Sequence, residues 1–146
     1  MTPKTPDVKP GLAIRKHATQ IVAAQLRRFA FEVNRAARPG NAGAVHDLRV
    51  SIRRLAQCLR LFAQFFPGGK AKKIRSRLKP IMTRAAEVRN RDVALDLLKS
   101  AGVAAPPPVI ERLKQERERA HRLLVADLRH WNRRRSFKKW RAQLEL

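Results

Sequence analysis

The residues of this chain that are best suited to chemistry form a row of cationic side chains between positions 46 and 60. Its members, spaced by three, four and seven residues, are His46, Arg49, Arg53 and Arg60. This spacing keeps side chains near one edge of an α-helix, and the row is roughly 21 Å long at about 1.5 Å per residue. Arginine binds phosphate oxygens through a planar fork of donors, and a protonated histidine donates two hydrogen bonds. The row therefore predicts multivalent binding of an extended anion.

An apolar stripe accompanies this row on the same expected helix. It consists of Val45, Leu48, Ile52, Leu55, Leu59, Phe62 and Phe66, which recur at spacings of three and four. Each cation follows a stripe residue by one position, and one residue is about 100° of rotation. The cations should therefore lie on the shoulder of a buried face, where they predict the wall of a groove.

The rest of the chain shows helical patterns separated by proline and glycine. Helices are expected at 12–37, 42–66, 70–101 and 109–131, with a short amphipathic helix around Trp140. Pro80 lies inside the third helix and predicts a kink, because proline lacks a backbone donor. We expect an all-α fold, a four-helix bundle with long antiparallel helices and a short C-terminal amphipathic helix. It should form a single domain at residues 11–146, after a flexible tail at residues 1–10.

The third helix carries cations on both shoulders of its core stripe. One shoulder holds Arg75, Lys79 and Arg89. The other holds Lys70, Lys73, Arg77, Arg84 and Arg91. Either row could face a cleft, and the spacing alone leaves that choice open.

The overall charge is strongly positive. Lys and Arg number 34 against 11 Asp and Glu, which gives a formal net charge of +23 in 146 residues. Such an excess opposes compaction unless anions bind, so it indicates a polyanionic partner: nucleic acid, an acidic membrane surface or a phosphate polymer. On the fourth helix glutamates alternate with arginines, which is typical of surface ion pairs. On the second helix only Asp47 accompanies the arginines.

Cysteine and apolar content exclude several classes of protein. Cys58 is the only cysteine, so an intrachain disulfide and a cysteine metal cluster are excluded, and we expect an inert thiol. The sequence has no apolar run of spanning length and no signal-peptide pattern. We therefore expect a cytoplasmic protein without a membrane partner.

Two segments resemble the hallmarks of the CHAD domain, the conserved histidine α-helical domain. One is Val45-His46-Asp47-Leu48-Arg49-Val50 with Arg53-Arg54-Leu55, and the other is Leu78-Lys79-Pro80-Ile81 with Ala86 to Val93. The resemblance implies a basic helical module that binds inorganic polyphosphate in a cationic groove. It places His46, Arg49, Arg53 and Arg54 at the family's first basic motif, and Lys79 and Arg89 at the second. Asp92 matches an aspartate of the family and is expected to orient an arginine, whereas Asn90 and Ala86 depart from the usual aspartate and glycine.

The complete set of predicted polyphosphate-binding residues combines the motifs with the two cationic rows. It comprises His46, Arg49, Arg53, Arg54, Arg60, Arg75, Lys79 and Arg89. Family members usually contain two such bundles, but here the motif occurs once. The chain is thus a half-length homodimer, a fragment of a longer protein, or a bundle that works alone. We expect the homodimer, in which paired His/Arg helices would enclose a channel.

The predicted function is non-enzymatic binding of polyphosphate, with no cofactor and no metal. An alternative is a basic helical nucleic-acid-binding protein, which the charge alone supports. A phosphohydrolase would need a metal site or a poised general base, and the dispersed acidic residues do not suggest either. Association with polyphosphate granules is a further expectation.

Overall fold

The computed structural model describes residues 10–39, 43–102, 104 and 106–146, and the expected tail lies outside this range except for its last residue. The described chain forms five α-helices and no strand, which confirms the predicted all-α helical bundle. The helices are α1 (Pro10–Ala36), α2 (Ala44–Leu61), α3 (Lys70–Ser100), α4 (Pro107–Arg133) and α5 (Ser136–Gln143). None of them combines the length and the apolar composition that a membrane-spanning helix requires.

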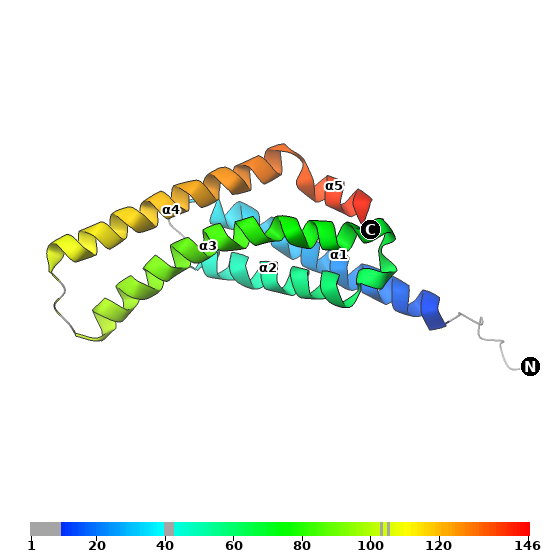
Figure 1. The fold of residues 1–146 in the computed structure, drawn as a ribbon, viewed down its shortest axis with the longest axis horizontal. Coiled ribbons are helices and arrows are strands. Elements are labelled where there is room, and N and C mark those ends of the chain that lie inside the picture. The colour runs from blue at the N-terminus through cyan, green and yellow to red at the C-terminus, as the bar shows by residue number, and fades with distance from the viewer. Residues whose placement is uncertain (1–9, 40–42, 103, 105) are drawn as a thin grey trace, which may run out of the picture.

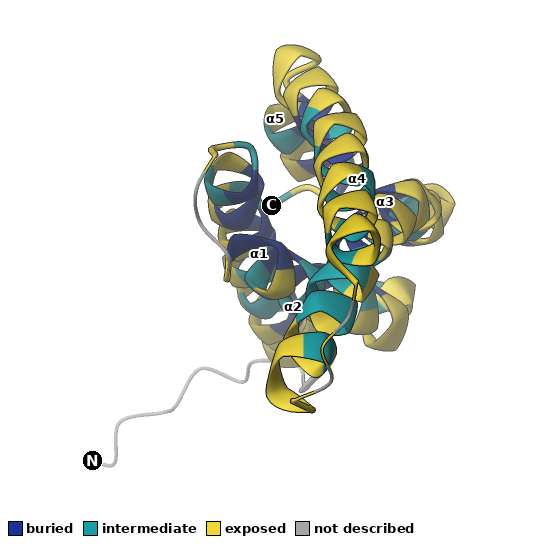
Figure 2. Ribbon diagram, turned by 90° about the vertical axis from the view of Figure 1, so that its left-hand side faces the viewer, coloured by how far each residue is buried: buried dark blue, intermediate teal, exposed yellow. Residues whose placement is uncertain are grey.

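The long helices pack in chain order, α1 on α2, α2 on α3 and α3 on α4 (Figure 1). Their buried faces meet in one core, and much of the outer surface of α4 is exposed (Figure 2). An aromatic cluster joins the two ends of the chain. Phe29 of α1 meets Trp131 edge-on at 5.1 Å and stacks on Trp140 at 6.0 Å between ring centroids. Both tryptophans are therefore core residues.

The expected end of the second helix is wrong. α2 ends at Leu61 rather than at Phe66, because Phe62 leaves helical geometry with φ −105° and ψ 17°. Two short 3-10 helices follow, and Gly68 and Gly69 adopt φ values of 54° and 68°. Glycine occupies this left-handed region without a side-chain clash, which lets the chain reverse into α3. Phe66 is nevertheless buried, so the apolar stripe extends beyond the helix.

The C-terminal half of α3, called its distal half below, and the first half of α4 form a two-helix arm. α3 is continuous through Pro80, and its two halves run in different directions in Figure 1. The distal half pairs with α4 and projects beyond α1 and α2. The buried positions of α3 end at Val88 and those of α4 begin at Leu124. We define the arm as residues Asp92–Arg119, and none of its described side chains is fully buried.

Candidate anion-binding site

Arg49 is the side chain around which the candidate site is built. It is partly buried on α2, and its Nε atom is buried without a hydrogen-bond partner. Burial lowers the pKa of the Arg49 guanidinium, and the positive charges of Arg53 and of Arg89 on α3 lower this pKa further. The guanidinium groups of Arg53 and Arg89 therefore lie close enough to repel that of Arg49. An anion beside Arg49 would relieve this repulsion and satisfy the buried donor.

The packing of α2 on α3 extends this cluster into a longer row. The two helices run antiparallel (Figure 1), so positions beyond Arg49 on α2 lie beside positions before Arg89 on α3. Arg60 is roughly 16 Å along α2 from Arg49, and Lys79 is roughly 15 Å along α3 from Arg89. We name this row the cationic strip. Its members are Arg49, Arg53 and Arg60 of α2 and Arg75, Lys79 and Arg89 of α3.

The cationic strip has no counter-charge within the described part of the chain. None of its six side chains forms an ion pair there. Asp47, the one acidic residue among the α2 arginines, lies 2.9 Å from Arg35 of α1. Arg35 also holds the buried Glu32 at 2.9 Å, and its hydrogen bond with Asp47 is the main cause that raises its pKa. Because α1 takes up the local acid, the strip keeps its full positive charge.

Two cations of the opposite shoulder of α3 pair with carboxylates of α4. Arg84 lies 3.2 Å from Asp127, and Arg91 pairs with Glu87 of its own helix and with Glu116 at 3.7 Å. The sequence left open which shoulder faces an anion. The structure favours the shoulder beside α2, since these two cations of the other shoulder already have carboxylate partners.

His46 and Arg54, which the sequence predicted in the same site as Arg49 and Arg53, also line a separate hollow. They line a hollow of about 270 Å³ on the α1 side of α2, together with Arg28. Arg28 was not predicted as a site residue. Its only signal in the sequence is its position four residues before Glu32, with which it pairs at 2.9 Å. Seven residues are nearly two helical turns, so the exposed His46 also shares an edge of α2 with Arg53. His46 thus stands between the hollow and the strip.

Other charged residues hold the arm together. Asp92 accepts a hydrogen bond from Arg117 of α4, which is the arginine-orienting role that the resemblance implied. Arg112 and Glu116 form one of the surface ion pairs expected on α4, at 3.3 Å. Arg117 reaches α3 instead of the glutamates of its own helix, which the alternating pattern did not predict.

The described residues give no direct support for a groove at the strip, for a metal site or for a reactive thiol. None of the hollows that we describe is lined by Arg49, so the groove stays a prediction. Within the residues placed by the structure, no group of three or more His, Cys, Asp or Glu is suited to hold a metal ion. Burial raises the pKa of the Cys58 thiol, which disfavours the reactive thiolate.

Comparison with known proteins identifies the family of this chain. The model of the CHAD domain matches residues 20–145, a span that includes α2, α3 and the whole cationic strip. No curated protein and no solved structure matches the chain. The family match extends over nearly the whole sequence and includes both segments that resemble the hallmarks of the family. The chain therefore belongs to the CHAD domain family.

Proposed function

We propose that the chain binds inorganic polyphosphate along the cationic strip and acts as a non-catalytic binding module. The observation that carries this proposal is the strip itself, six cations from two packed helices that form no ion pair with a described residue. The CHAD family is linked to polyphosphate-related proteins, which agrees with this choice of ligand. A linear polymer of phosphates can meet several guanidinium groups in succession and needs no base recognition.

Nucleic acid is the less favoured ligand because the described residues offer no aromatic side chain that is both exposed and free of a cation over its ring. Proteins that bind single strands stack bases on exposed aromatic side chains. Trp131 and Trp140 are only 6% and 2% exposed and belong to the core. Phe31 is 54% exposed, but Arg28 and Arg35 lie over its ring at 5.5 and 5.9 Å from the centroid. The charge would still attract DNA and RNA without sequence preference.

Competition at fixed salt tests the choice of ligand. Long-chain polyphosphate at equal phosphate concentration should displace a labelled DNA duplex, and the duplex should not displace labelled polyphosphate. Equal competition in both directions would show general polyanion binding and would contradict the proposal. Incubation of polyphosphate with the protein, with and without Mg²⁺, should release no phosphate. Release above the buffer control would contradict the non-catalytic part.

We further propose that a second copy of this chain packs on the arm, and not on the His/Arg helix α2 as the sequence led us to expect. Three large apolar side chains of the arm are exposed: Val93 at 39%, Leu97 at 62% and Val109 at 45%. The arm contains five Asp or Glu and five Lys or Arg, so it is neutral, whereas the rest of the chain has 29 cationic residues against six acidic ones. Like-charge repulsion between copies is therefore smallest at the arms. Two arms together would supply the four helices that a bundle needs to bury such side chains.

Mass measurement by light scattering tests the dimer. Leu97→Glu should shift the mass toward that of a monomer, because it places a charge in the apolar contact. The matched control is Leu12→Glu on α1, since Leu12 is 59% exposed and lies outside the arm. A wild-type monomer at high protein concentration, or an equal shift in both variants, would exclude the arm as the interface.

A further inference from the structure

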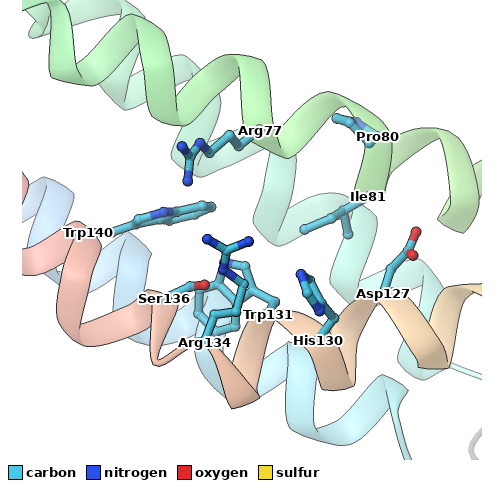
Figure 3. A pocket seen from close by; sticks show the side chains of 9 residues that line it. All are labelled: Arg77, Pro80, Ile81, Asp127, His130, Trp131, Arg134, Ser136 and Trp140. Carbon is cyan, nitrogen blue, oxygen red and sulfur yellow. The ribbon is translucent and has the colours of Figure 1, made fainter.

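A second cationic hollow lies where α3 meets the end of α4 and the start of α5 (Figure 3). Its volume is about 270 Å³. Arg77 extends from α3 and Arg134 from the end of α4 toward the same space, and the His130 side chain points into it from below. Trp131 and Trp140, the only two tryptophans of the chain, also line it. We name this hollow the tryptophan pocket.

The two arginines of the tryptophan pocket are not compensated by an ion pair within the described residues. Neither Arg77 nor Arg134 forms an ion pair with a described residue. Asp127 also lines the pocket, but its carboxylate lies 3.2 Å from Arg84. Two guanidinium groups that converge on one hollow repel each other unless an anion lies between them.

Uncharged donors are present at the same pocket. Trp131 is 6% exposed, and its Nε1 atom is buried without a hydrogen-bond partner. Ser136, the first residue of α5, is another lining residue, so the pocket lies at the N-terminus of that helix. The N-cap residue Arg135 supplies no side-chain acceptor to the first turn. The free amide groups and the dipole of a helix N-terminus both favour an anion.

We propose that the tryptophan pocket binds a short inorganic phosphate anion of about the size of pyrophosphate. Arg77 and Arg134 extend into one hollow of about 270 Å³, so a short run of phosphoryl groups is enough to contact both guanidinium groups. A tetrahedral oxyanion with several oxygens can use the arginine forks and the neutral donors at once. The pocket shares no residue with the cationic strip, so this proposal does not depend on long-chain binding.

Tryptophan fluorescence provides a direct test, because both tryptophans lie at the pocket. Titration with pyrophosphate should change the emission in a saturable manner, and isothermal titration calorimetry should give the same dissociation constant. Arg77→Ala combined with Arg134→Ala should raise this constant at least tenfold. Trp131→Phe keeps an aromatic ring but removes the indole N–H, so it should weaken binding while Trp140 still reports it.

The matched control is Arg129→Ala combined with Arg133→Ala, which removes the same charge from exposed positions of α4 outside the pocket. This variant should keep the wild-type response. Arg49→Ala combined with Arg53→Ala should also keep the wild-type response to pyrophosphate, but its affinity for long-chain polyphosphate should fall. This difference separates the present proposal from the proposed function. The proposal would be overturned if the wild type gave no calorimetric signal with pyrophosphate. It would also be overturned if the control variant lost as much pyrophosphate affinity as the pocket variant, or if sulfate bound as tightly as pyrophosphate.

Discussion

Removal of Arg49 and Arg53 is the most direct test of the cationic strip. A charge-assisted hydrogen bond contributes about 1.5–3 kcal/mol, and we assign this range to the half-buried Arg49. Arg53 is exposed, so its contact with a phosphate contributes about 0.2–1 kcal/mol. The double variant Arg49→Ala with Arg53→Ala should therefore lose about 2–4 kcal/mol of binding free energy. A flexible polymer can shift to the remaining cations, so the dissociation constant should rise at least tenfold, which is about 1.4 kcal/mol.

The assay is a titration with long-chain polyphosphate at several salt concentrations. The matched control is Arg129→Ala with Arg133→Ala, which has the same residue type, the same spacing of four and the same charge change on another helix. The strip variant should also show a smaller dependence of affinity on salt, because fewer counterions are released. Equal losses in the two double variants would mean that only net charge matters, and unchanged affinity would refute the strip.

Arg49 should strengthen ligand binding but lower the stability of the chain without ligand. The pKa of Arg49 is lowered, so the folded state disfavours its charged form, and at neutral pH that charge costs stability. Arg49→Met keeps the aliphatic stem and removes the charge. Without polyphosphate, this variant should unfold at or above the melting temperature of the wild type. Added polyphosphate should raise the melting temperature of the wild type more than that of Arg49→Met. A lower melting temperature for Arg49→Met without ligand would mean that Arg49 has a partner in the free chain.

Other consequences of the structure can be measured with single variants. Arg35→Met should lower the melting temperature more than Arg27→Met, because Arg35 joins the buried Glu32 to Asp47; equal effects would show that this network is not important for stability. Because burial raises the pKa of Cys58, its thiol should react with a disulfide reagent at pH 8 more slowly in the folded chain than in denaturant; equal rates would contradict the burial. A fluorescent fusion of the wild type should gather at polyphosphate granules in cells that store the polymer, and the strip double variant should not. Retention of that variant would assign recruitment to another surface.

Much of the fold follows from local sequence signals. The apolar spacing predicted the four long helices, because helices of this length bury a face that repeats every three to four residues. The breaks at proline and glycine were also placed well, and Gly102, just after α3, has a positive φ of 63°. The end of α2 was placed too late. The apolar stripe continues to Phe66, but a buried phenylalanine can also come from a turn, and spacing does not distinguish the two cases.

The sequence by itself determined the helical class, the excess of positive charge and the residues Arg49, Arg53 and Arg89 as candidates. These are properties of composition and of periodicity along one helix. Only the tertiary structure decided which cations have a carboxylate partner among the described residues. Asp47 turns to Arg35, and α4 provides carboxylates to one shoulder of α3 alone. The physical reason is that ion pairing depends on distances between helices, and helical spacing carries no information about them.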